Sequence, residues 1–296
     1  MAKRIVLSAL VLLVMAAVAL IVVPADRSGP FVLENFFVPA SDYSIEVTVL
    51  RPKGLGPFGV VVLNHGVGAT REERMLESPE PFLRSAAAFA ERGYAVVMPL
   101  RRGFGATGGG YAESPGACGD PDFRHGERAA STDVLAAYRF AQKLPYVDPT
   151  RMILAGQSAG GVVSLYAASE SPPGLQAVIA FAAGRGADAA GQPGVPCAAA
   201  ALGALFADIG KSIKVPALLY YAENDLFFGP ATARMWYGRL RQGAPGAELI
   251  VQPAFESNGH FVFTDPDGQR AWLPAVEDFL RRHHIGFDAP PKQQRI

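Results

Sequence analysis

Short apolar runs alternate with longer helical segments along most of the chain. Continuous apolar runs, expected for strands buried on both faces of a sheet, occupy residues 60–63, 95–98, 152–155, 177–181 and 217–221, and a last strand is predicted at 248–251. Helices are predicted between them at residues 81–92, 126–144, from 159 onward, 231–242 and 269–283. The alternation predicts an α/β fold in which helices cover both faces of a mostly parallel central sheet.

The first predicted strands have a different pattern. Residues 45–49 (IEVTV) alternate apolar and polar positions, as in a strand with one buried face. We therefore expect an N-terminal antiparallel hairpin formed by residues 31–38 and 44–51. A chain of 296 residues can bury one large core but leaves little room for a second unrelated domain, so residues 31–285 are predicted to form one domain.

Both ends of the chain differ from this domain in composition. Lys3 and Arg4 precede an apolar run over residues 5–23, which is long enough to cross a membrane and is followed by a small residue, Ala25. Residues 1–25 are therefore predicted to be a cleaved signal peptide or an uncleaved membrane anchor. Either places the domain outside the cytoplasm, periplasmic, secreted or anchored. The polar tail at 288–296, with two prolines, is predicted to be flexible.

One internal segment interrupts the rhythm of strands and helices. Residues 183–211 are rich in alanine, glycine and proline. We interpret this segment as a candidate lid insertion, with an ordinary surface excursion as the alternative.

A serine lies between a predicted buried strand and a predicted helix. Residues 156–160 (GQSAG) match the Gly-x-Ser-x-Gly turn that exposes a nucleophilic serine above the sheet. Glycine is expected on both sides because a side chain there would collide with the neighbouring strand and helix. The pattern alone is weak evidence in a chain with 32 glycines, but its position between strand and helix predicts that Ser158 is a nucleophile.

A serine nucleophile needs a base and an orienting carboxylate. Of the five histidines, His260 alone lies in a loop after the last predicted strand, where it can reach over the sheet. The strand at 217–221 leads into Glu223 and Asp225, at the carboxyl edge where α/β sites assemble. Asp225 is the predicted acid and Glu223 the competitor.

Other residues near the predicted site have less certain roles. The backbone N–H groups of Val67 and Ala159 are the predicted oxyanion hole, because residues 65–68 (HGVG) follow a buried strand. His65 is expected to pack and shape this loop, with a direct catalytic role as the alternative. Arg101 and Arg102 are expected to form an internal ion pair that fixes a glycine-rich loop, and the alternative is that they face the substrate. Candidate pocket walls, each with a core or surface position as the alternative, are Tyr111, Phe227, Phe228 and residues 183–211.

Charge and cysteine content narrow the expected partners. The chain has 27 basic and 27 acidic residues and no basic stripe, which argues against nucleic-acid binding and favours a small-molecule substrate. Cys118 and Cys197 are the two cysteines, and an exported protein could pair them as a disulfide between two loops. Two unpaired thiols are the alternative. Neither cysteine has a second ligand at metal-binding spacing, so we expect no metal and no cofactor.

Several short motifs resemble a known group of enzymes. Residues 64–66 (NHG), 102–103 (RG), 156–160 (GQSAG), 223–225 (END) and 259–260 (GH), in this order, resemble the dienelactone hydrolase-like and prolyl oligopeptidase-like branch of the α/β-hydrolases. The resemblance covers about residues 31–285 and implies an α/β-hydrolase catalytic domain. It implies Ser158, Asp225 and His260 as the triad. Dienelactone hydrolases use cysteine as nucleophile, so the serine here favours ester hydrolysis.

The combined prediction is a serine hydrolase that cleaves an ester-type bond of a small substrate through an acyl-enzyme. A peptidase or thioesterase with the same triad is the first alternative. A non-catalytic envelope protein with a hydrolase-like fold is the second, and the complete set of Ser, Asp and His argues against it.

Overall fold

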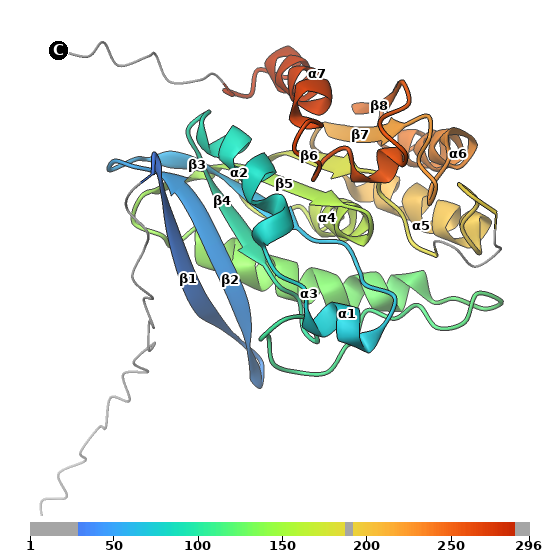
Figure 1. Ribbon diagram of the computed structural model, residues 1–296, viewed down its shortest axis with the longest axis horizontal. Coiled ribbons are helices and arrows are strands. Elements are labelled where there is room, and N and C mark those ends of the chain that lie inside the picture. Colours follow the sequence, from blue (N-terminus) through green and yellow to red (C-terminus); the bar gives the residue numbers. More distant parts are fainter. Residues whose placement is uncertain (1–28, 187–191, 288–296) are drawn as a thin grey trace, which may run out of the picture.

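An eight-stranded sheet runs through the protein, with helices on both of its faces (Figure 1). The structure, a computed structural model, describes residues 29–186 and 192–287. The strands are β1 (Phe31–Ala40), β2 (Tyr43–Pro52), β3 (Phe58–Asn64), β4 (Tyr94–Pro99), β5 (Val147–Gln157), β6 (Leu175–Phe181), β7 (Ala217–Ala222) and β8 (Ala247–Gln252). The helices are α1 (Arg71–Met75), η1 (Glu80–Phe82), α2 (Leu83–Ala90), α3 (Phe123–Ala141), α4 (Ala159–Ser169), α5 (Ala199–Ser212), α6 (Pro230–Arg241), η2 (Gly259–Phe261) and α7 (Gln269–Arg282).

The sheet has the strand order β1-β2-β4-β3-β5-β6-β7-β8. β1 and β2 form the predicted antiparallel hairpin, and β2 is also antiparallel to β4. All pairs from β4 to β8 across the sheet are parallel. The expected fold class is therefore confirmed, and the carboxyl ends of β3, β5, β6, β7 and β8 all meet at one edge of the sheet.

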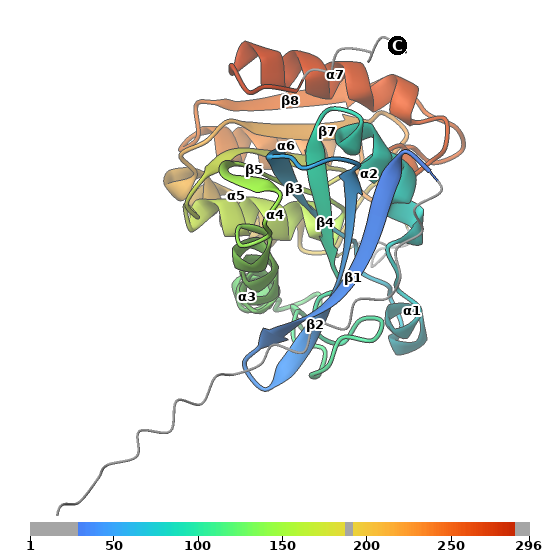
Figure 2. The ribbon, with the colours of Figure 1, turned by 90° about the vertical axis from the view of Figure 1, so that its left-hand side faces the viewer.

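Two hydrophobic layers cover the sheet, one on each face. In β3, Val60 and Val62 face one layer, while Val61 and Leu63 face the other. The first layer contains buried side chains of α3, α4, α5 and α6, and the second contains those of α2 and α7. Figure 2 shows α3 and α2 on opposite sides of the twisted sheet. The uninterrupted apolar runs of the inner strands follow from this burial on both faces.

Helix α5 occupies much of the segment interpreted as a candidate lid. Its side chains Leu202 and Phe206 are buried in the core, and a Cβ atom at Gly210 would lie 2.1 Å from the carbonyl oxygen of Leu240 in α6. Residues 199–212 thus form a core helix, which the alanine-rich composition had concealed. The connection before it remains the only part of the segment to which the lid prediction applies, and residues 187–191 lie outside the described part of the chain.

Two predictions about the chain ends cannot be placed on this fold. The predicted signal peptide or anchor, at residues 1–25, and the predicted flexible tail, at 288–296, lie outside the described residues. Within residues 29–186 and 192–287, no helix has both the length and the apolar character needed to cross a membrane.

Candidate active site

Ser158 stands at the sharp turn between β5 and α4. Its backbone has φ +57° and ψ −125°, a combination that residues other than glycine rarely adopt. The turn is held from the neighbouring strand because the N–H of Ser158 donates to the carbonyl of Phe181, 2.9 Å away. Strain of this kind persists only where the surroundings enforce it, and it is common at functional sites.

The two glycines of the GQSAG motif allow three elements to meet at this turn. A Cβ atom at Gly156 would lie 2.3 Å from the carbonyl oxygen of Gly160. A Cβ atom at Gly160 would lie 2.1 Å from the carbonyl oxygen of Asn64, at the end of β3. The structure therefore shows the physical reason for glycine that the sequence suggested: α4 packs against β5 and β3 at backbone contact.

His260 and Asp225 face each other on two neighbouring loops. His260 lies in η2 after β8, and its Nδ1 atom is 3.1 and 3.2 Å from the two carboxylate oxygens of Asp225, which follows β7. Both side chains are buried, with 5% and 2% of their surface exposed. A neutral imidazole that donates Nδ1–H to the carboxylate keeps Nε2 as a proton acceptor, the state that a general base requires.

Backbone groups hold the carboxylate of Asp225 in place. Its Oδ1 atom accepts hydrogen bonds from the N–H groups of Phe227 and Phe228, at 2.8 and 2.9 Å. Glu223, the competing candidate, is exposed, and its backbone N–H donates to Gln252 of the adjacent strand β8. The structure therefore places Asp225, and not Glu223, beside the imidazole.

Two asparagines join the loop of the acid to the loop of the base. The Oδ1 atom of Asn258 accepts from the N–H groups of both Leu226 and His260, each at 3.1 Å. Asn224 binds the backbone of Phe255 through both its donor and its acceptor. Neither asparagine was assigned a role from the sequence, although an asparagine one or two residues before a predicted catalytic residue is a common turn-forming signal.

The nucleophile and the base are also connected. The side-chain amide of Gln157, the residue before Ser158, donates to the carbonyl of His260 over 2.7 Å. The structure thus brings Ser158, Asp225 and His260 onto adjoining loops at the carboxyl edge of the sheet. This is the arrangement needed for a serine activated by a histidine that a carboxylate orients.

The predicted oxyanion loop lies against the nucleophile. A Cβ atom at Gly66 would be 3.4 Å from Ser158 Cβ and 3.9 Å from its Oγ. Val67, one predicted N–H donor, is the next residue along this loop, and Ala159, the other, directly follows Ser158 as the first residue of α4. The N–H group of Ala159 is at the start of a helix, where the first N–H groups have no partner inside the helix. Such a group is suited to bind a developing negative charge.

His65 shapes this loop and is not free to act as a base. Its Nε2 accepts the backbone N–H of Arg101 at 3.2 Å, so the ring proton is on Nδ1, which donates to the carbonyl of Gly66 at 2.8 Å. Burial and the nearby Arg101 guanidinium hold the pKa of His65 well below its usual range. The expectation of a packed, loop-shaping histidine is consistent with these contacts.

The two adjacent arginines form internal ion pairs, as expected. Arg101 is 1% exposed, binds Glu113 through two nitrogens at 2.8 and 3.0 Å, and donates to the carbonyls of His65 and Gly66 at 2.9 and 3.0 Å. Arg102 pairs with the buried carboxylate of Asp133 at 2.7 Å. Arg101 therefore fixes the carbonyl groups that precede Val67 in the oxyanion loop.

Another arginine, Arg185, which was not singled out from the sequence, also binds Glu113. Arg185, in the connection after β6, binds Glu113 at 3.1 Å and Glu127 of α3 at 2.6 Å. Burial alone would raise the pKa of Glu113, but Arg101 and Arg185 outweigh it and lower the pKa to about 2. Glu127 forms its ion pair with Arg185, but burial and the nearby negative charge of Glu113 keep its pKa raised. We call Arg101, Glu113, Arg185 and Glu127 the buried ion cluster.

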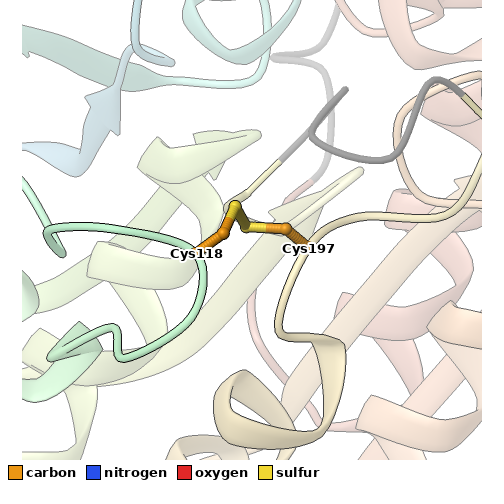
Figure 3. Close-up of a disulfide and its surroundings, with 2 residues drawn as sticks. All are labelled: Cys118 and Cys197. Carbon is orange, nitrogen blue, oxygen red and sulfur yellow. A yellow bond between two sulfur atoms is a disulfide. The ribbon is translucent and has the colours of Figure 1, made fainter.

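The predicted disulfide lies directly outside this cluster. Cys118 and Cys197 are bonded, and they join the connection that carries Glu113 to the segment that precedes α5 (Figure 3). The N–H of Cys197 donates to the carbonyl of Gly186, next to Arg185, over 2.7 Å. The bond therefore ties together the two loops whose charges meet in the buried ion cluster.

Comparisons with known proteins agree with this architecture. The family model described as X-Pro dipeptidyl-peptidase (S15 family) matches residues 42–226, which is more than half of the chain and includes Ser158 and Asp225. No curated protein sequence matches the chain.

Solved structures of hydrolases share the fold at low sequence identity. The esterase Pf2001 from Pyrococcus furiosus has a TM-score of 0.61 at 19% identity, over 86% of this chain and 92% of its own. An assigned dienelactone hydrolase from Klebsiella pneumoniae has a TM-score of 0.59 at 17% identity, over 86% of this chain and 100% of its own. Est1E from Butyrivibrio proteoclasticus has a TM-score of 0.57 at 14% identity, over 84% of this chain and 98% of its own.

The superfamily inferred from the sequence motifs is thereby confirmed. The parallel sheet, its N-terminal hairpin and the structural neighbours establish the α/β-hydrolase fold. Within this superfamily of serine hydrolases, the chain belongs to the X-Pro dipeptidyl-peptidase (S15) family.

Proposed function

We propose that the protein hydrolyses an ester bond of a small substrate, with Ser158 as nucleophile, His260 as base and Asp225 as the orienting acid. The observation that supports this most is the strained turn at Ser158, joined through Gln157 to the loop of a histidine that is paired with a buried carboxylate. A protein without catalytic function has no need for this combination of strain and burial.

The proposed reaction is acyl transfer to water. Ser158 Oγ attacks the carbonyl carbon while His260 Nε2 takes its proton, and the N–H groups of Val67 and Ala159 donate to the oxygen that becomes negative. The imidazolium, stabilised by Asp225, then gives the proton to the leaving alcohol. In the second half, His260 takes a proton from a water molecule as that water attacks the acyl-enzyme. The proton then returns to Ser158 Oγ, and the carboxylic acid product is released.

Cleavage of an amide bond is the second candidate, because the matching family is described as a dipeptidyl-peptidase. The same residues would serve, with His260 protonating an amine as it leaves; a thioester could be cleaved in the same way. A panel containing p-nitrophenyl butyrate, a butyryl thioester and Ala-Pro-p-nitroanilide separates the three. Turnover of the anilide without turnover of the ester would reverse the order of the candidates.

Labelling with a fluorophosphonate probe tests the proposed nucleophile. We expect the wild-type protein to be labelled covalently and Ser158→Ala not to be labelled, because only an activated serine attacks the probe at an appreciable rate. Intact mass and circular dichroism spectra verify that the variant is folded. Equal labelling of both proteins, or no labelling of the wild type, would falsify the proposal and would favour a non-catalytic protein with this fold.

We also propose that the domain works outside the cytoplasm. The disulfide supports this location, because such bonds persist mainly in oxidising compartments. The apolar run at residues 5–23 supports it independently, as an export signal or a membrane attachment.

A further inference from the structure

Large hydrophobic side chains are exposed mainly on one edge of the protein. In residues 29–186 and 192–287, seven such side chains are exposed, and five lie on connections that follow parallel strands at the carboxyl edge of the sheet. These five are Met75, Leu76, Val195, Leu226 and Phe261. The other two, Phe37 on β1 and Leu55 before β3, lie elsewhere. The same edge carries Ser158, Asp225 and His260.

Two of these side chains directly follow catalytic residues in the sequence. Leu226, which is 47% exposed, follows Asp225, and Phe261, which is 48% exposed, follows His260. The Phe261 ring contacts the imidazole edge-on, with centroids 5.3 Å apart. Single exposed apolar side chains are common, but two that directly follow proposed catalytic residues at one edge of the sheet favour a surface that contacts a ligand.

Phe227, which follows Leu226 in the chain, lies beside both the imidazole and Phe261. Its ring centroid lies 4.5 Å from that of His260 and 6.0 Å from that of Phe261, and its own side chain is half-buried. We call Leu226, Phe227 and Phe261 the apolar wall. Two rings of the wall, Phe227 and Phe261, contact the imidazole of His260, and none of its three side chains carries a charge.

The apolar wall is held rigidly and continues onto a neighbouring segment. The N–H of Gly194 donates to the carbonyl of Leu226 over 2.6 Å, and the carbonyl of Gly194 accepts from Gly229 over 2.8 Å. These bonds place Val195, which is 45% exposed, on a segment fixed to the wall. A surface whose backbone is already ordered loses little entropy when a ligand covers it.

The buried charged groups beside the proposed triad are already paired within the protein. Asp225 is occupied by His260 and two backbone N–H groups, and Arg101, Glu113 and Arg185 neutralise one another in the buried ion cluster. Recognition at the wall therefore depends on contact with apolar groups. A carboxylate or ammonium group placed against Leu226 and Phe261 would lose hydration without gaining a partner.

We propose that the substrate is an ester with an uncharged, apolar chain, which lies against the apolar wall while its carbonyl is at Ser158. This inference rests on the proposed ester hydrolysis and specifies its substrate class. Chain methylenes that leave water for the wall stabilise the bound ester and the transition state together. Each added methylene is then expected to raise kcat/KM by about 2- to 4-fold until the wall is covered.

A series of p-nitrophenyl esters from acetate to octanoate tests the proposal. We expect kcat/KM of the wild type to rise with chain length to at least the butyrate. The double variant Leu226→Ser/Phe261→Ser should lose most of this rise, measured as the ratio of kcat/KM for hexanoate to that for acetate. Leu226→Ser alone should lose part of it. Leu55→Ser, at a site 94% exposed and far along the chain from the catalytic loops, is the matched control and should keep the wild-type ratio.

The possible results separate this inference from the proposed function. If Ser158 is labelled by fluorophosphonate and acetate is hydrolysed, but the ratio does not rise with chain length or is unchanged in the double variant, the apolar-chain substrate is rejected while ester hydrolysis stands. If Ser158 is not labelled, both fail. If the wild type is a dimer, the double variant a monomer and the ratios equal, the wall binds a second copy of the chain, and the inference is also rejected.

Discussion

Asp225 does two things that a carboxylate at this position must do together. One oxygen, Oδ1, accepts two backbone N–H groups, which fixes the rotation of the side chain, and both oxygens lie within hydrogen-bonding distance of His260 Nδ1. In the proposed reaction, the negative charge stabilises the imidazolium that forms when Ser158 is deprotonated. Orientation and charge can be separated by substitution, because an amide keeps the acceptor and removes the charge.

Asp225→Asn is therefore expected to fold normally and to lose most activity. Its amide oxygen still accepts from Phe227 and Phe228, but its NH2 group opposes Nδ1–H and favours the wrong tautomer, with a loss in kcat of roughly 10⁴-fold. The measurement is kcat on a p-nitrophenyl ester, with melting temperature as the check on folding. Glu223→Gln is the control and should retain wild-type kcat. Retention of a tenth or more of kcat by Asp225→Asn would show that another group orients the imidazole.

Each of the three proposed catalytic residues has a local signal in the sequence, which is why reasoning from the sequence could find them. Ser158 lies between glycines at a strand end, and Asp225 and His260 each follow a strand. The supporting contacts have no such signal. Glu113 and Arg185 are 72 residues apart, and only the fold brings their charges together. The family match ends at residue 226, so the position of His260 rests on the structure.

At the scale of elements, the buried ion cluster connects the loops after β3, β4 and β6 with helix α3. Arg101 holds the oxyanion loop after β3, Glu113 lies between β4 and α3, Arg185 follows β6, and Glu127 belongs to α3. Buried charges of this kind are stable only while all partners are present. The cluster is thus a single structural unit behind the catalytic loops.

The lowered pKa of Glu113 gives a pH dependence with a definite sign. A carboxyl whose pKa falls from its usual 4.5 to about 2 on folding contributes stability above pH 4.5, and this contribution is lost as the pH falls toward 2. Glu113→Gln should therefore lower the free energy of unfolding at pH 7 by about 3 kcal/mol. Its stability should also decrease less than that of the wild type between pH 4.5 and 2.5.

Urea unfolding at several pH values measures both effects. Glu80 is exposed, so Glu80→Gln serves as control, and its free energy of unfolding should match that of the wild type at every pH. Parallel curves for Glu113→Gln and the wild type over the acidic range would mean that other carboxylates dominate acid unfolding.

The elements themselves were predictable to different degrees, for physical reasons. Inner strands buried on both faces leave continuous apolar runs, so β3 to β7 were located within a few residues. Helix α5 was missed because Gly203 and Gly210, which allow its close approach to α6, and many alanines remove the contrast between its faces. Close packing of backbones requires small residues, and small residues weaken the periodic signal.

For the molecule as a whole, the disulfide is the longest covalent constraint. It joins residues 79 positions apart, so its main effect is to restrict the unfolded chain, by roughly 4 kcal/mol for a loop of this length. The double variant Cys118→Ser/Cys197→Ser should accordingly unfold at a lower urea concentration than the oxidised wild type. Dithiothreitol should shift the wild type toward the variant and leave the variant unchanged. Equal midpoints with and without dithiothreitol would contradict the expected stabilisation.

The order of strands in the sheet has a consequence for the order in which the three proposed catalytic residues are brought into place during folding. From β5 to β8 the strands are neighbours in chain order, so each new strand can pair with an edge that the preceding one has just created. The proposed nucleophile enters with the first of these strands, the acid two strands later, and the base only after the last. A growing or truncated chain that ends before η2 holds a positioned serine but no base. The proposed hydrolysis therefore requires that β8 and the loop after it have docked, and a chain without this loop is expected to be inactive.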